Sequence, residues 1–448
     1  MKAIRMKSRI KLKTGPKRQL NKYIFFSVIW LALISLRPAL IQAGTVQFSL
    51  VQHSTNNIFQ TYQPVSDWLT TGSFFFGGDS SSLALYGGLD FNYLYKYSGL
   101  SSVGGQLGVD YLIPVGSKSA FYLAAEGQGV LFKDLYNNFN HAGLKLVASF
   151  KSYLTPATVL RLESQSIYRS YKLGIFDYFS EMVNLSLDHY FKTRTTLKVE
   201  ASYGYKYFYH PGEIAIIEGE AAPVAMISSS APVYGLSSVN QPTSFFISQQ
   251  GGPGGGHGRP ADNYKQGGSY SLRGVPYQTV YYTDPRSIQI LAVSGLLAQG
   301  LGDRVGLSLG GMKQWNLRGE NPFSASDEYY SVENPTSDLF SWQGFSLKAK
   351  LTASLTDRLQ AEIQYDYLNR EFPGLESLDL EGVSLGVIRE DRRHQLSTLV
   401  QLDLARVSFF VSYSYISNAS NDPWFDWSGN FISGGLKWNL SVSKSKQQ

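Results

Sequence analysis

The sequence contains no cysteine among its 448 residues, and only 17% of the residues are charged. The absence of cysteine excludes disulfide bonds, thiolate metal sites, a cysteine nucleophile and a lipid-modified N-terminal cysteine. Beyond residue 43 there is no run of 18 consecutive apolar residues, which excludes a helical membrane span from that part of the chain. Long amphipathic helical patterns are missing as well. Tyrosine, phenylalanine and glycine are abundant instead, at 30, 26 and 43 residues.

The N-terminal segment has the layout of an export signal. Residues 1–22 carry nine lysines or arginines and no acidic residue, and residues 23–36 are almost entirely apolar. With Ala43 as a small residue before the cut, this order is typical of a secretory signal peptide. The apolar run is shorter than the about 20 residues that a transmembrane helix needs. We expect a signal peptide over 1–43 and one domain over 44–448, with an uncleaved N-terminal anchor as the alternative.

Removal of this segment changes the charge of the protein. Residues 1–43 hold ten of the 40 basic residues and none of the 34 acidic ones, so the remaining chain has a net charge of −4. The basic pI of 9.0 therefore belongs to the precursor. A nucleic-acid partner, which a basic surface would favour, is not predicted.

The remaining chain repeats a pattern of alternating apolar and polar residues. In 197–207, Leu197, Val199, Ala201 and three tyrosines alternate with polar residues or glycine, and similar patterns occur in 183–191, 345–355, 359–367 and 408–415. A period of two indicates strands with one apolar and one polar face. Runs of about ten residues suit a tilted strand that crosses a bilayer.

The connections between these strands alternate in length. Seven are tight, at 77–81, 115–118, 154–158, 192–194, 301–304, 355–358 and 404–407. Eight longer ones lie near 53–57, 97–101, 132–139, 171–178, 208–285, 317–340, 370–392 and 418–427. This predicts an all-β, antiparallel transmembrane β-barrel of about 16 strands, with short periplasmic turns and long extracellular loops. Because 58–76 and 286–300 alternate poorly, the range is about 14 to 18.

Tyrosines cluster where the strands meet the longer connections. They are Tyr203, Tyr205, Tyr207, Tyr365, Tyr367, Tyr413 and Tyr415. The boundary between lipid headgroups and hydrocarbon favours such amphipathic rings, whereas no comparable rule applies to a soluble sandwich or propeller. We expect these residues to form an aromatic girdle in contact with outer-membrane lipid.

The last strand resembles a known assembly signal. Ser433, Gly435, Trp438 and Leu440 match the pattern by which bacterial barrel-assembly machinery recognises its clients, although eight residues follow Leu440. The stretch 417–430 is similar to the last loop of several poorly characterised outer-membrane barrels. The resemblance implies a porin-like barrel in the bacterial outer membrane with that machinery as a partner.

With the apolar face toward lipid, the alternate positions face the lumen. The candidate lumen-lining residues are Lys145, Lys151, Arg161, Glu163, Arg169, Asp188, Lys198, Glu200, Lys206, Lys348, Lys350, Glu362 and Asp366, joined by Asp110, Glu126 and Asp403. A barrel of this size is wide enough for an aqueous channel. The sequence predicts passive or loop-gated diffusion of small polar solutes, with the apolar part of loop 208–285 folded over the mouth. A closed interior is the alternative.

An enzyme is not predicted. His53, Thr55 and Asn56 faintly resemble the His-x-Ser-Asn pattern of outer-membrane lipases, but threonine stands where the nucleophilic serine belongs. The glycine-rich stretch 251–258 lacks the rest of a phosphate-binding motif, and the histidines lack metal-site spacing. No cofactor is implied. A partner in surface-protein export, an adhesive surface protein and a homo-oligomer stay open as alternatives.

Overall fold

The computed structural model describes residues 44–78, 82–133, 139–172, 174–209, 286–320, 338–380 and 383–441. The expected signal peptide over 1–43 and most of the long loop, residues 210–285, lie outside the described residues. Among the residues described, no helix is both long and apolar enough to cross a membrane.

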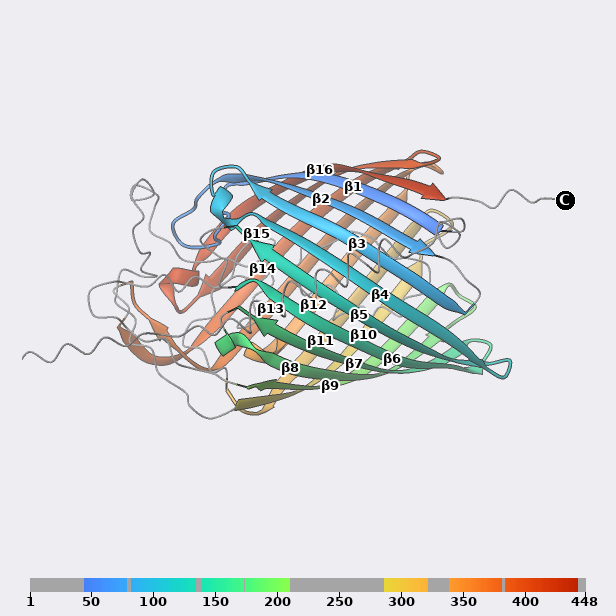
Figure 1. Cartoon of the computed structure of the whole chain (residues 1–448), viewed down its shortest axis with the longest axis horizontal. Coiled ribbons are helices and arrows are strands. Elements are labelled where there is room, and N and C mark those ends of the chain that lie inside the picture. Colours follow the sequence, from blue (N-terminus) through green and yellow to red (C-terminus); the bar gives the residue numbers. More distant parts are fainter. Residues whose placement is uncertain are drawn as a thin grey trace, which may run out of the picture.

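The described residues form sixteen strands in one closed antiparallel barrel (Figure 1), in which each strand pairs with its chain neighbours and β16 pairs with β1. This confirms the predicted fold class. The strands are β1 (Gly44–Thr55), β2 (Asp67–Gly78), β3 (Leu83–Leu94), β4 (Ser102–Val115), β5 (Ser119–Phe132), β6 (His141–Thr155), β7 (Thr158–Tyr171), β8 (Tyr178–Tyr190), β9 (Thr195–Phe208), β10 (Arg286–Gly300), β11 (Val305–Arg318), β12 (Gln343–Ser354), β13 (Leu359–Leu378), β14 (Ser384–Asp403), β15 (Val407–Ser420) and β16 (Trp427–Ser441).

All seven predicted tight turns connect consecutive strands, and both ends of the barrel sequence lie on the turn side. Two predicted boundaries are wrong. Residues 58–66 precede β2 as part of a loop, because the strand begins only at Asp67. The predicted long loop 370–392 is mostly strand: β13 and β14 extend to Leu378 and from Ser384. Pairing continues there through an irregularity after Glu371, which accommodates Pro373 and Gly374.

The strands are tilted, and the pairing register gives the direction of the tilt. A path that steps from each residue to its partner on the next strand starts at Val46 near the turn end of β1 and reaches Ser287 near the loop end of β10. A second path of this kind starts at Leu297, nearer the turn end of β10, and reaches the loop end of β1. Taken together, a path of paired residues once around the barrel is shifted by about 20 residues along the strands. Residues at equal depth therefore lie about 1.25 residues closer to the turns on each following strand.

Candidate functional site: the lumen and its constriction

The two faces of the wall have opposite chemistry. On β9, Leu197, Val199 and Tyr203 are exposed, whereas Lys198 and Glu200 between them are buried. The same division holds on β8, β12 and β13, where exposed leucine, isoleucine and tyrosine alternate with less exposed polar residues. In a barrel made of a single sheet, the exposed apolar face is the outer wall and the charged face lines the interior. On this basis the polar positions of these strands face the interior and their apolar positions face outward.

The predicted girdle residues share the outer wall. Tyr203, Tyr365, Tyr413 and Tyr415 are about 40% exposed, and Tyr205, Tyr207 and Tyr367 are half-buried on the same face. The structure adds a second set of exposed aromatic residues toward the tight turns, which the sequence reasoning did not identify: Tyr111, Phe121, Tyr153, Tyr190, Phe409 and Trp438. Each of them lies within four residues of the turn end of its strand, and this position is the sequence signal that could have identified them.

All thirteen candidate lumen residues lie on the inward face, and most are paired with one another. Lys198 Nζ lies 2.8 Å from Glu200 Oε2, and Arg161 Nη2 lies 3.9 Å from Asp188 Oδ2. On β12 and β13 the distances are 3.1 Å for Lys350 to Glu362 and 3.8 Å for Lys348 to Asp366. The charged patch on β7–β9 continues across β6 and β7 through Lys145, Lys151, Glu163 and Arg169. Charges of both signs therefore alternate along the inner wall.

Besides the charged residues on β7–β9 and on β12–β13, a third polar patch lies on the inner wall of β3, β4 and β5. It contains tyrosines that the sequence did not predict for the lumen. Tyr86 donates a hydrogen bond to Glu126 at 3.1 Å, and Tyr122 donates one to Asp110 at 3.3 Å. The Tyr86 ring fits because Gly108 faces it, where a Cβ would come within 2.3 Å of the ring. Glycine on β4 thus makes room for a bulky polar side chain on β3, a pairing that no single-strand pattern indicates.

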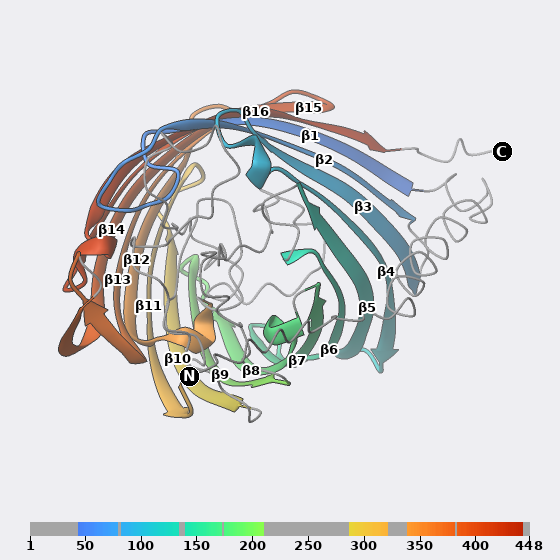
Figure 2. The same cartoon turned by 60° about the vertical axis from the view of Figure 1, so that its left-hand side comes forward.

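A short segment from the connection after β11 narrows the lumen. The 3-10 helix η6 (Leu339–Ser341) lies inside the ring of strands, beside β9 and β10, and is the orange helix in Figure 2. Phe340 packs with the inward-facing Met182, Ile288 and Ile290. Gln314 on β11 donates hydrogen bonds to the backbone carbonyls of Leu339 at 2.7 Å and Trp342 at 2.6 Å. These contacts explain why the inward face of β10 is apolar and why 286–300 alternates poorly.

Lys206 holds this segment to the wall. Its ammonium group lies 2.7 Å from Asp338 Oδ2 and within 4.3 to 5.8 Å of the ring centroids of Tyr178, Phe208 and Phe340. The Lys206 side chain is only 1% exposed, whereas that of Asp338 is 25% exposed. Asp338 also caps η6 by accepting a hydrogen bond from the backbone nitrogen of Phe340. A predicted lumen lysine is thus an anchor for the constriction.

The loop ends of the strands carry an apolar collar on the inside. Its members come from the connections as well as from the strands, and they include Ile58, Phe59, Tyr97, Leu100, Phe132, Phe139, Tyr171, Phe176, Phe208 and Phe340. Because several connections contribute, they fold toward the interior instead of standing upright in water. The opening at this end is therefore lined by packed side chains.

Beside the collar lies a buried basic cluster on β13 and β14. Arg370 and Arg389 both contact Asp391, at 3.0 Å and 2.7 Å from its Oδ2 atom. Arg389 also stacks over the rings of Phe372 and Phe425. The sequence reasoning missed this cluster because it placed a loop over 370–392. The signal it overlooked was the alternation Arg389, Asp391, Arg393.

The predicted assembly residues form the seam between β16 and its neighbours. Ser433 points inward and lies 2.8 Å from His53 Nδ1, while Trp438 on the outward face is exposed. Gly435 also points inward, where a Cβ would come within 2.7 Å of the Leu50 carbonyl oxygen and 2.9 Å of the Phe410 ring. These contacts give Ser433 and Gly435 structural roles in closing the barrel.

The weak lipase-like pattern is not assembled as a catalytic group. The hydroxyl groups that contact His53 belong to Ser433 and Thr71, whereas Thr55 accepts a hydrogen bond from the backbone of Asn57. Asn56 accepts one from the backbone of Asn430. Within the described ranges, no group of three or more histidine, aspartate or glutamate side chains could hold a metal ion.

A closed single sheet with an apolar exterior and a charged interior defines a porin-like β-barrel. The sequence matches no protein-family model and no curated protein. The fold is similar to the crystal structure of Acinetobacter baumannii OccAB1, with a TM-score of 0.42 and 9% identity over 89% of this chain and 96% of that chain. It is also similar to the outer membrane protein OpdK of Pseudomonas aeruginosa, with a TM-score of 0.42 and 10% identity over 89% and 100%. A loop-deletion mutant of OmpT, an outer membrane protein of Vibrio cholerae, has a TM-score of 0.37 and 12% identity over 89% of this chain and 100% of that chain.

Proposed function

We propose that the protein is a channel of the bacterial outer membrane through which small polar solutes diffuse, with η6 at its narrowest part. The observation that carries the proposal is the charged inner wall, with four ion pairs on β7–β9, β12 and β13. Charged side chains suit an interior that holds water, whereas a lysine or arginine on the lipid face would cost about 2–4 kcal/mol at mid-depth. An interior that had to be dry would instead be packed with apolar residues throughout, as the collar is.

The test is reconstitution of the refolded protein, residues 44–448, into planar bilayers and liposomes. We expect discrete conductance steps in the bilayers and swelling of liposomes in solutions of small sugars and amino acids. Liposomes that contain fully folded barrels and stay impermeable to ions and sugars would rule out the channel and favour a closed interior. Folding is checked separately by the shift in gel mobility between heated and unheated samples.

We also propose that the chain is exported, that its signal peptide is cleaved after Ala43, and that the barrel-assembly machinery recognises β16 and inserts the barrel. The resemblance of Ser433, Gly435, Trp438 and Leu440 to the recognition signal supports this route. The girdle tyrosines and the second aromatic set would then lie at the two lipid headgroup boundaries, as amphipathic rings do in barrels of this kind.

Charge reversal in one lumen patch should change ion selectivity. In the Lys348→Glu/Lys350→Glu variant, Glu362 and Asp366 lose their partners and the patch becomes strongly acidic. A unit charge about 4 Å from a passing ion changes its energy by about 1 kcal/mol even in water. We expect the reversal potential in a salt gradient to shift toward cation preference. The matched control is Arg304→Glu, an exposed residue at a tight turn, whose reversal potential should stay at the wild-type value.

A further inference from the structure

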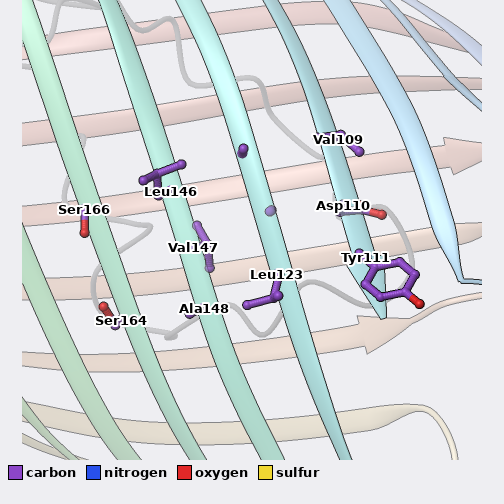
Figure 3. Close-up of a pocket in the computed structure, with 11 residues that line it drawn as sticks. Val109, Asp110, Tyr111, Leu123, Leu146, Val147, Ala148, Ser164 and Ser166 are labelled. Atoms are coloured by element: carbon purple, nitrogen blue, oxygen red, sulfur yellow. The ribbon is translucent and has the colours of Figure 1, made fainter. Parts of the chain in front are cut away.

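The outer wall of β4–β7 contains a hollow of about 340 Å³ (Figure 3). Its outward-facing lining includes Leu123, Ala125, Leu146, Ala148, Ser164 and Ser166. Four of these six side chains are small, whereas large leucine, phenylalanine and tyrosine side chains are exposed on the wall around it. The small residues therefore leave a recess in a wall of large apolar side chains.

The hollow follows a row of paired residues that ends at a carboxylate. Val109, Ala125, Leu146 and Ser166 are successive cross-strand partners, and the next residue in this row is Glu181 on β8. Because of the strand tilt, the row rises toward the loops by about five residues between β4 and β8. With about 4.8 Å between strands, it covers about 19 Å of the wall. The hollow is therefore an oblique groove that leads from the middle of β4 to Glu181, near the loop end of β8.

Glu181 brings an uncompensated negative charge to the end of this groove. It shares the outward face of β8 with the exposed Leu185 and Leu187. The hydroxyl groups of Ser164 and Ser166, which line the groove, donate hydrogen bonds to its two carboxylate oxygens. These two bonds use only part of the acceptor capacity of a carboxylate. Among the residues that the structure describes, no basic side chain forms an ion pair with it.

The depth of Glu181 distinguishes it from other carboxylates on the outward face. Glu371 and Glu390 are cross-strand partners on β13 and β14, and Glu371 lies four residues beyond the girdle residue Tyr367 toward the loop end. Glu181 pairs directly with the girdle residue Tyr205 on β9. With the girdle at the boundary of the lipid head groups, Glu371 and Glu390 lie in water, whereas Glu181 lies at the level of the head groups.

Tyrosine rings border the carboxylate on its loop side. Tyr168 on β7 and Tyr207 on β9 are the cross-strand partners of Phe179, which lies two residues from Glu181 on the same face of β8. The ring of Tyr209 packs edge to face against both tyrosines, with centroid distances of 6.0 Å to Tyr168 and 5.2 Å to Tyr207. Aromatic faces attract an ammonium group, and phenol hydroxyl groups can donate hydrogen bonds to a phosphate. A carboxylate beside such rings is therefore suited to a zwitterionic head group.

We propose that this groove binds one ethanolamine phospholipid, with its ammonium group at Glu181 and one acyl chain in the hollow. The polar end of the groove lies at the head groups and its apolar end lies toward the membrane centre, which is the orientation of a lipid in the outer leaflet. The groove is also long enough, because the hydrocarbon of one leaflet is about 15 Å deep. A phospholipid without the amine would bring only its phosphate to the carboxylate, and the two would repel each other. The proposal depends on membrane insertion but not on transport.

Native mass spectrometry of the folded protein in detergent tests the head group. The protein is incubated with equal amounts of an ethanolamine and a glycerol phospholipid that have identical acyl chains. We expect the ethanolamine lipid to be retained at least about tenfold over the glycerol lipid, which corresponds to about 1.4 kcal/mol. Glu181→Gln should abolish this preference, and the matched control Glu371→Gln, at an outward carboxylate beyond the girdle, should keep it. Equal retention of both lipids by the wild type, or an unchanged preference in Glu181→Gln, would overturn the proposal.

Filling the hollow is the second measurement, and it tests the acyl chain separately from the head group. Ala148→Phe places a ring in the hollow, and we expect the retained amount of ethanolamine lipid to fall at least about tenfold. The control is Ala349→Phe, on the outward face of β12 between Leu309 and Tyr365, which should retain the lipid as the wild type does. Unchanged retention in Ala148→Phe, or displacement of the phospholipid by an equal amount of lipopolysaccharide, would contradict the proposed occupant. Gel mobility verifies the folding of each variant, and conductance is recorded in parallel, so loss of the lipid and loss of the channel remain separate results.

Discussion

Replacing Lys206 by methionine is expected to raise the single-channel conductance by releasing η6 from the inner wall. Methionine keeps the apolar contacts with Tyr178 and Phe208 but removes the charge that pairs with Asp338 at 2.7 Å. A hydrogen bond to a charged group contributes about 1.5–3 kcal/mol, so the docked state should lose roughly ten- to a hundredfold in population relative to the released state. The measurement is conductance in planar bilayers, together with the frequency of switching between levels.

The matched control is Lys198→Met on the same strand. Lys198 is also buried and paired, at 2.8 Å from Glu200, but it does not contact η6. Its variant should therefore keep the wild-type frequency of switching between levels, while the loss of this lumen charge is expected to change ion selectivity. A second variant, Gly204→Val, keeps the Lys206 pair and pushes against Phe340, because a Cβ there would lie 2.9 Å from the ring. If both Lys206→Met and Gly204→Val conducted like wild type, η6 would not be the constriction.

The barrel itself could be predicted from the sequence because two independent signals agree. Alternation in 197–207 and 345–355 identified faces that the structure has, and the seven tight turns fixed the number of strands. Each signal is local, since a strand's two faces and a short turn depend on neighbouring residues alone. The error over 370–392 has a local cause too. Pro373 and Gly374 are typical turn residues, but a bulge in the paired strands accommodates them here.

The constriction could not be predicted, because it depends on contacts between distant segments. Nothing near Lys206 in the sequence indicates Asp338, which is 132 residues away. Poor alternation in 286–300 predicts only a weak strand from the sequence, whereas in the structure its inward-facing Ile288 and Ile290 pack against Phe340. Apolar residues on both faces of a barrel strand therefore indicate a segment packed inside.

Substitution of Gly435 by valine should strongly impair closure of the barrel. A side chain there would meet the carbonyl oxygen of Leu50 on one neighbouring strand and the ring of Phe410 on the other. Overpacking of this kind costs about 1–3 kcal/mol, and at the seam it opposes the last pairing to form. We expect a lower unfolding temperature, measured as the loss of the fast-migrating form on gels as the sample is heated.

Gly434→Val is the control for this substitution. Gly434 faces outward, and a Cβ there would lie no nearer than 3.8 Å to any neighbouring atom, so this variant should unfold at the wild-type temperature. Refolding into detergent without any assembly machinery separates two roles for Gly435. A defect of Gly435→Val in detergent assigns the glycine to packing against Phe410. Normal stability in detergent combined with failed insertion in cells would instead assign it to recognition by the machinery, and the packing argument would be wrong.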